Sequence, residues 1–158
     1  IYETLQAIGA KCEKTVDQED YYFNLPSGDS ASKMKYRVEG AIRRLIYYTR
    51  PDFKQGESSQ CEFKCFDDPD GELFAILKEA LGIKVVVQKK REEWLAGPAI
   101  FHLDDVVGVG HLFELEYVTE DPQKDEQVFH ALTTRFAPHL GEVATFSNMQ
   151  LVGMSASD

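Results

Sequence analysis

Charged side chains recur at every second position in several short stretches, which is the spacing that places them on one face of a β-strand. Arginine binds phosphate through its forked guanidinium, and lysine binds it as a point charge. Two carboxylates beside such cations are typical of a Mg²⁺ or Mn²⁺ site, because hard cations take oxygen ligands and bridge phosphate oxygens. The alternating sets are Lys35/Arg37/Glu39, Lys89/Arg91, His102/Asp104 and Glu114/Glu116.

A strand with one charged face can be accommodated in two ways. In a half-buried sheet the charged face simply meets water. In a closed barrel the apolar faces would lie under covering helices, and the charged faces would line the interior. Burying an unpaired cation costs several kcal/mol, so such an interior needs an anionic ligand, acidic partners and water. The alternation alone leaves both interpretations open.

The elements that would position these residues form an α+β pattern. Helical spacing of apolar residues predicts helices over 1–10, over 73–81 and from Pro122 onward. Turn residues at 26–29 and 97–98 favour hairpins and therefore an antiparallel sheet. Strands are expected at 12–24, 34–39, 45–50, 61–66, 84–94, 100–106, 112–117 and 144–152.

Composition bounds the class of protein. The chain has 158 residues and a net charge of -10, which fits one domain over 1–158 and argues against a general nucleic-acid binder. No apolar run reaches the roughly 18 residues of a membrane helix. Three cysteines are too few for a disulfide scaffold, so a reducing, cytoplasmic location is expected. Cations concentrate at 33–50 and 84–91, and acids at 104–126.

An ordered set of short motifs resembles the CYTH superfamily, particularly its class IV adenylyl cyclase branch. The likeness covers nearly the whole chain. Each motif is weak alone, but their order along the chain is specific. The motifs are DYYFNLP from Asp20, KYRVE from Lys35, LIYYTRPD from Leu45, VQKKRE from Val87, HLD from His102, GVG from Gly108 and FELE from Phe113.

The resemblance implies a triphosphate tunnel fold, in which an antiparallel barrel with flanking helices holds a triphosphate and a divalent metal, Mg²⁺ or Mn²⁺. It implies no assigned catalytic residue. It leaves His102 between a role as a ligand inside the tunnel and a hydrogen-bonded structural role, and it leaves a homodimer open. The implied phosphate-binding residues are Lys35, Arg37, Arg50, Lys89 and Arg91, and the implied metal ligands are Glu114, Glu116, Glu39 and Asp104.

The sequence also departs from the family pattern. The family opens with a Glu-x-Glu-x-Lys strand, whereas this chain is expected to start at the following helix, with that strand absent. Ile100, Val107 and Asn148 stand where the family usually has an arginine, an acid and an aspartate. Three functions therefore stay open. They are a cyclase that makes cyclic AMP and pyrophosphate, a triphosphatase acting on tripolyphosphate, thiamine triphosphate or a nucleotide, and a non-catalytic phosphate-binding module.

Overall fold

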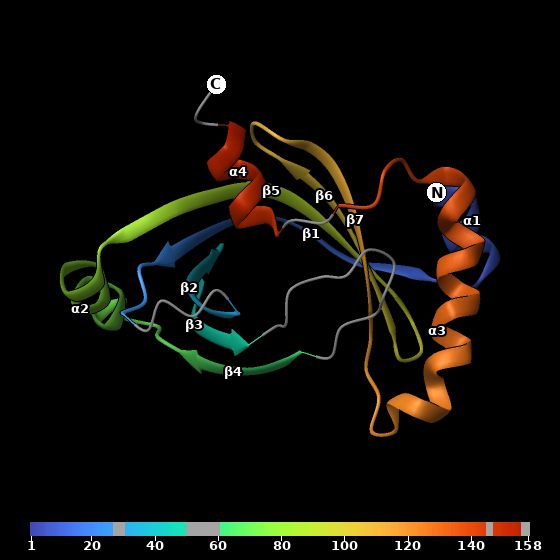
Figure 1. Ribbon diagram of the computed structural model, residues 1–158, viewed down its shortest axis with the longest axis horizontal. Helices are drawn as coiled ribbons and strands as arrows, with labels where there is room; N and C mark the ends of the chain where they lie inside the picture. Colours follow the sequence, from blue (N-terminus) through green and yellow to red (C-terminus); the bar gives the residue numbers. More distant parts are fainter. Residues whose placement is uncertain (27–30, 50–60, 145–146, 156–158) are drawn as a thin grey trace.

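A single antiparallel sheet of seven strands forms the body of the molecule (Figure 1). The computed structural model describes residues 1–26, 31–49, 61–144 and 147–155. The strand order is β4-β3-β2-β1-β5-β6-β7. The strands are β1 (Lys11–Phe23), β2 (Ser32–Glu39), β3 (Ile42–Thr49), β4 (Glu62–Asp67), β5 (Ile83–Ala96), β6 (Ala99–Val106) and β7 (Gly110–Tyr117). The antiparallel sheet and the α+β class predicted from the sequence are confirmed.

Two tight hairpins set the registers that matter for the charged residues. Gly40 joins β2 to β3 and Gly97 joins β5 to β6, with φ of +59° and +58°. This left-handed backbone suits glycine, which has no Cβ. The β5–β6 hairpin places Arg91 opposite Asp104. Because side chains alternate along each strand, these registers bring the charged positions of neighbouring strands to one face.

The sheet curls, so that β2, β3 and β4 lie across from β5, β6 and β7 (Figure 1). Its inner face is called the concave face below. The expectation of a closed barrel is corrected here, since β4 and β7 are the edge strands and, within the described residues, no strand joins them. The sheet is therefore an open, curled one.

Helices cover the outer, apolar face. Phe74 of α2 (Glu72–Leu81) stacks against Tyr21 and Tyr36 with ring centroids 4.9 and 4.7 Å apart. At the other end of the sheet, Leu5 of α1 (Tyr2–Ala7) and Phe136 of α3 (Pro122–Phe136) pack with Phe101. A short 3₁₀ turn, η1 (Ala137–His139), follows α3. Among the described helices, none has the length and hydropathy to cross a bilayer.

The last element is a helix rather than the predicted strand. Residues of the expected strand 144–152 belong in part to α4 (Asn148–Ser155). Its first turn is a capping box, in which the Gln150 side chain accepts from the Ser147 backbone N–H at 2.9 Å and the Gln150 N–H reaches Ser147 Oγ at 3.4 Å. Met149 and Val152, three residues apart, pack with Tyr22, Val87 and Val106. The helix thus lies on the concave face.

Candidate functional site

One aspartate on β1 holds two cations of β2. Asp20 lies opposite Arg37 in the strand register. Arg37 donates from Nε to Oδ1 at 2.7 Å and from Nη2 to Oδ2 at 2.8 Å, and Lys35 Nζ donates to Oδ2 at 2.8 Å. The aspartate is buried, while the side chains of Lys35 and Arg37 are 12% and 18% exposed. These three residues are called the Asp20 unit.

The electrostatics of the Asp20 unit follow from burial and mutual contact. Burial opposes ionisation of Asp20, but the charges of Lys35 and Arg37 outweigh it and hold the pKa of this carboxyl below its usual value. Burial lowers the pKa of Lys35 to about 8, with Asp20 opposing the change and the charges of Arg37 and Lys89 adding to it. Lys35 therefore loses its proton at lower pH than an ordinary lysine does.

A second unit repeats the arrangement on β5 and β6. Asp104 lies opposite Arg91. Arg91 donates from Nε to Oδ1 and from Nη2 to Oδ2, each at 2.6 Å, and Lys89 Nζ donates to Oδ2 at 2.6 Å. Here the side chains of Lys89 and Arg91 are only 2% and 6% exposed. Burial also lowers the pKa of Lys89, with the charge of Arg91 as the next cause. These residues are called the Asp104 unit.

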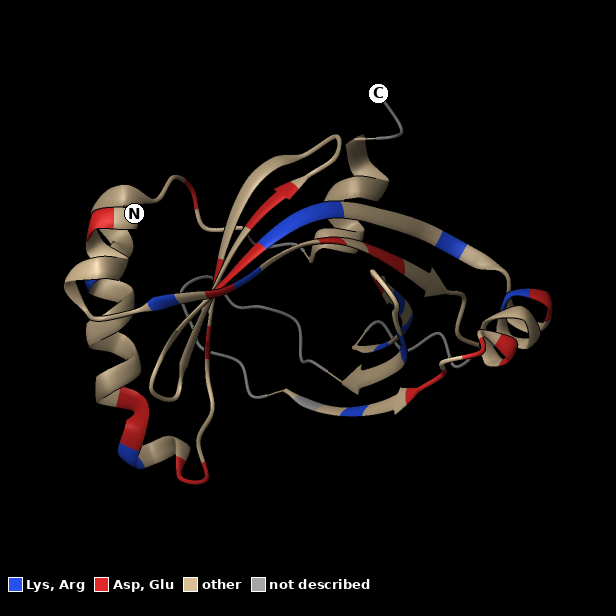
Figure 2. Ribbon diagram, turned by 180° about the vertical axis from the view of Figure 1, so that it is seen from behind, with Lys and Arg blue, Asp and Glu red and all other residues tan. Residues whose placement is uncertain are grey.

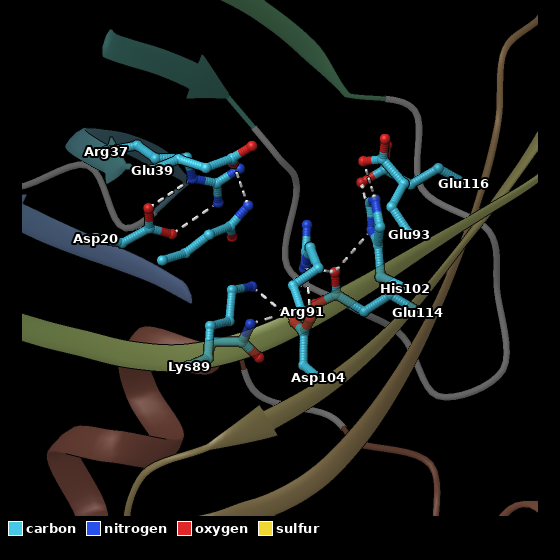
Figure 3. A network of polar contacts seen from close by, with 12 residues as sticks. Asp20, Arg37, Glu39, Lys89, Arg91, Glu93, His102, Asp104, Glu114 and Glu116 are labelled. Carbon is cyan, nitrogen blue, oxygen red and sulfur yellow. Dashed lines mark hydrogen bonds and ion pairs between the residues drawn. The ribbon is translucent and has the colours of Figure 1, made fainter. Parts of the chain in front are cut away.

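Both units lie on the concave face, because alternation along the strands directs their side chains to the same side of the sheet. Figure 3 shows Asp20 and Arg37 of the first unit in one view with Lys89, Arg91 and Asp104 of the second. Figure 2 shows the same interleaving of Lys and Arg with Asp and Glu on the central strands. The four cations that the sequence predicted as phosphate-binding residues are thus placed together, on a shared and largely buried face. Arg50, the fifth, lies outside the described residues.

A third cluster of polar groups lies beside the Asp104 unit. Glu114 of β7 is opposite His102 of β6, and Glu114 Oε2 accepts from Arg91 Nη2 at 3.1 Å. His102, Glu114 and Glu116 each offer one donor atom, and these atoms lie within 4.8 Å of one another. Burial opposes ionisation of Glu114, but the adjacent imidazole, Arg91 and Lys89 keep its pKa well below the usual value. This trio is called the His–Glu cluster.

The carboxylates predicted as further metal ligands, Glu39 and Asp104, accept hydrogen bonds from basic residues. Both oxygens of Asp104 accept bonds from Lys89 and Arg91. Glu39 accepts from Lys14 at 2.7 Å and from Gln18 at 2.6 Å. Neither residue belongs to the His–Glu cluster. The geometry therefore groups Glu114 and Glu116 with His102, and it groups Glu39 and Asp104 with basic residues.

The ion pairs around these groups contain acids and bases in nearly equal number. Among the described residues of this network, six carboxylates face five Lys and Arg side chains and the imidazole of His102. The cations are Lys14, Lys35, Arg37, Lys89 and Arg91, and the carboxylates are Asp20, Glu39, Glu93, Asp104, Glu114 and Glu116. Such a face does not attract a polyanion by net charge alone. A bound divalent cation would reverse the balance at the end that carries the His–Glu cluster.

Two structural partners escaped the sequence analysis. Asp20 was noted only as part of a motif, although it organises the first unit. Its strand carries polar residues on both faces, so alternation gives no signal there. Glu93 lies 3.3 Å from His102. It is two residues after Arg91 on β5, so its position on the same face as Lys89 and Arg91 could have been predicted from the alternation.

Comparison with protein families gives one extensive match. The model of the CYTH domain matches residues 1–144 of this chain. No curated protein matches it significantly.

Solved structures share the fold at low sequence identity. A Pyrococcus horikoshii protein, PH1012, is 22% identical with a TM-score of 0.77, covering 96% of this chain and 91% of its own. A candidate adenylate cyclase from Vibrio parahaemolyticus is 17% identical with a TM-score of 0.64, covering 86% and 80%. HpAC1 of Hippeastrum, a candidate adenylyl cyclase with a dominant triphosphatase activity, is 17% identical with a TM-score of 0.60, covering 90% and 84%. These likenesses establish the tunnel-type fold.

Proposed function

The chain belongs to the CYTH domain family, and from this premise we propose that it is a metal-dependent enzyme acting on a small molecule that carries a triphosphate. The sequence motifs are most similar to those of class IV adenylyl cyclases, so the first activity proposed is the conversion of ATP to cyclic AMP and pyrophosphate. The concave face would bind the triphosphate, and the His–Glu cluster would hold a divalent cation, Mg²⁺ or Mn²⁺.

The observation that carries this proposal is the pair of Lys-x-Arg units on one face. Each unit shares one aspartate between two cations, which leaves the Asp20 unit with an excess positive charge, while Arg91 of the Asp104 unit also pairs with Glu114. The bonds to Asp20 use Nε and Nη2 of Arg37, and a guanidinium has five N–H groups, so donors remain for phosphate oxygens. The aspartates hold these donors in place before a ligand arrives, which reduces the entropy lost on binding.

The residues fit a divalent cation at the acidic end. Carboxylates of Glu114 and Glu116 supply oxygen ligands, and Nδ1 of buried His102 has no hydrogen-bond partner among the described residues. When bound, the cation neutralises the negative charge of the nearby carboxylates and polarises a phosphoryl oxygen. The proposed binding residues remain those implied by the family, including Arg50 outside the described part of the chain.

In the proposed cyclase reaction, the ribose 3′-hydroxyl attacks the α-phosphorus in line with departing pyrophosphate. The task of the chain is electrostatic. Lys35 and Arg37 hold phosphate oxygens, while Lys89 and Arg91 stabilise the charge that develops on the leaving group. Because the concave face is largely buried, these interactions act with little competition from water.

Triphosphate hydrolysis is the second candidate. It uses the same cations, with water attacking the terminal phosphorus. The dominant triphosphatase activity of HpAC1, which shares this fold, favours testing it in parallel. A binding module without turnover is the third possibility, and the same assay separates all three.

The test is incubation of the protein with ATP and with tripolyphosphate, each with Mg²⁺ or Mn²⁺. Cyclic AMP with pyrophosphate supports the cyclase, and released inorganic phosphate supports the triphosphatase. Saturable binding without product reduces the protein to a binding module. The double substitution Glu114→Gln with Glu116→Gln should abolish the metal requirement or turnover, whereas the exposed Asp105→Asn should leave both unchanged. Absence of triphosphate binding under all conditions would refute the proposal.

A further inference from the structure

His102 is buried in an environment that leaves one of its ring nitrogens without a partner. The residue is 4% exposed. Within the described residues, Nδ1 makes no hydrogen bond. It lies 3.7 Å from Glu114 Oε2 and 3.6 Å from Glu116 Oε1, as Figure 3 shows for the group. Nδ1 is thus a buried polar atom that faces two carboxylates at ion-pair separation without a hydrogen bond to either of them.

The opposite ring nitrogen explains how the imidazole is oriented. Nε2 of His102 lies 3.3 Å from Oε2 of Glu93, and the two residues are opposite each other on β6 and β5. A carboxylate only accepts hydrogen bonds, so Nε2 carries the proton in this contact. When Nδ1 carries no proton, as a metal ligand must, its lone pair lies on the side of the two glutamates, and a cation bound there would be shared by all three groups.

This set of contacts is the arrangement that histidine ligands of metals adopt in proteins. Such a histidine donates its second N–H to a carboxylate, which fixes the ring and makes the free nitrogen a better ligand. Two ligands that are each about 2.1 Å from one cation lie no more than about 4.2 Å apart. The separations of Nδ1 from the two carboxylate oxygens, 3.6 and 3.7 Å, satisfy this limit.

We propose that Nδ1 of His102, together with Glu114 and Glu116, binds a divalent first-row transition cation in preference to Mg²⁺, and that Glu93 is the positioning residue of this site. Imidazole nitrogen suits transition cations, whereas Mg²⁺ is bound by oxygen. The inference rests on the proposed function only in taking this cation as the one that accompanies the triphosphate. Cation binding itself needs no substrate.

The test uses Mn²⁺ with the purified protein in the absence of any nucleotide or phosphate. Calorimetry measures the affinities for Mn²⁺ and Mg²⁺, and pulsed electron paramagnetic resonance detects ¹⁴N coupling to bound Mn²⁺. We expect ¹⁴N coupling in the wild type and an affinity for Mn²⁺ at least about tenfold above that for Mg²⁺. Wild-type protein saturated with Mn²⁺ but showing no ¹⁴N coupling would overturn the proposal without any variant being needed.

Substitutions separate the ligand from its support. His102→Gln should lose the ¹⁴N coupling and weaken Mn²⁺ binding at least about tenfold, with a smaller change for Mg²⁺. Glu93→Gln should keep the coupling but weaken Mn²⁺ binding. The matched control is His111→Gln, since His111 is 89% exposed and should change neither. Equal Mn²⁺ affinity in wild type and His102→Gln would show instead that this histidine only pairs with its neighbouring acids.

The outcome is independent of the activity assay. If ¹⁴N coupling is present but neither ATP nor tripolyphosphate is bound or turned over, the cation site stands and the proposed function fails. If turnover occurs with Mg²⁺ and Mn²⁺ alike and no ¹⁴N coupling is seen, the proposed function stands and the ligand role of His102 fails.

Discussion

The Asp20 unit and the Asp104 unit contain the same three types of side chain, in the same strand register and with the same pattern of bonds, but in different surroundings. The cations of the Asp20 unit are 12% and 18% exposed, and those of the Asp104 unit 2% and 6%. The Asp104 unit also continues into the His–Glu cluster through the Arg91–Glu114 contact.

The difference in burial gives the same bonding pattern two different consequences. In the Asp20 unit water reaches the two cations, so a ligand at the proposed site could take the place of that water. Where burial is nearly complete, as in the Asp104 unit, the aspartate is first of all the counter-ion that makes two buried charges tolerable. Substitutions in the two units test that contrast.

The largest effect is expected from removing the charge of Asp104. Asp104→Asn leaves Lys89 and Arg91 buried without their shared counter-ion and should reduce the free energy of unfolding by about 3–5 kcal/mol. Asp20→Asn should cost less, roughly 1–3 kcal/mol, because its cations are partly hydrated. Urea denaturation measures both. Equal losses would remove the contrast between the units, and Asp105→Asn, whose side chain is 63% exposed, is the control.

The next effect concerns ligand binding. Arg37→Ala and Lys35→Ala should each weaken tripolyphosphate binding by about 1.5–3 kcal/mol, as expected for loss of a charge-assisted bond. Arg91→Ala should weaken binding and also lower stability, because Asp104 keeps only Lys89. Calorimetry with tripolyphosphate and Mn²⁺, paired with denaturation of each variant, separates the two consequences. Unchanged affinity in both Lys35→Ala and Arg37→Ala would place the ligand elsewhere.

The site could be predicted from the sequence only in strands where charged residues alternate regularly with other residues. In β2 and β5 the Lys-x-Arg positions alternate with apolar or outward residues, so their shared face was predictable. The partner aspartates required knowledge of which strands pair, and no local pattern specifies that β1 lies between β2 and β5. The shared face of Glu114 and Glu116 was also predictable from their spacing, whereas their proximity to His102 came from the register of β6 and β7.

The errors have physical causes as well. Residues 144–152 contain β-forming types, but Ser147 and Gln150 have the spacing of a capping box, which favours a helix start. That signal was stronger than strand propensity. Closure of the sheet could not be predicted, because it depends on twist and curl accumulated over seven strands rather than on any segment.

A pH effect of intermediate size is expected from Lys35. Its pKa is lowered from 10.5 to about 8. The unfolded chain therefore binds more protons between these values, so deprotonation of Lys35 adds to stability as pH rises from 8 to 10.5. Over the same range the site loses one positive charge, and tripolyphosphate affinity should fall about tenfold.

The comparison for this pH effect is Lys35→Arg, which cannot lose its charge in this range. Tripolyphosphate affinity is measured for both proteins from pH 7 to beyond 9. Protonation of the ligand affects both curves equally, so it drops out of the difference between them. Parallel curves for wild type and Lys35→Arg would rule out Lys35 as the titrating group.

The smallest effect is expected at an exposed pair that resembles the buried ones only in charge. Arg44 donates to Asp67 at 2.7 Å, but the two side chains are 46% and 72% exposed. Arg44→Ala should change the free energy of unfolding by less than about 1 kcal/mol. A loss as large as that of Asp20→Asn would mean that exposure does not govern the strength of these pairs. Thermal or urea unfolding of the two variants side by side provides the measurement.

The position of α4 has a consequence for the strength of the charges beside it. Met149 and Val152 press on Val87 and Val106, and Val106 sits directly across from Lys89 in the ladder. Apolar side chains therefore lie beside Lys89 in the sheet, and hydrocarbon screens charge far less than bulk solvent does. An anionic group bound there would be attracted more strongly than on an open surface. Removing α4 would weaken that attraction without changing any charged residue of the two units.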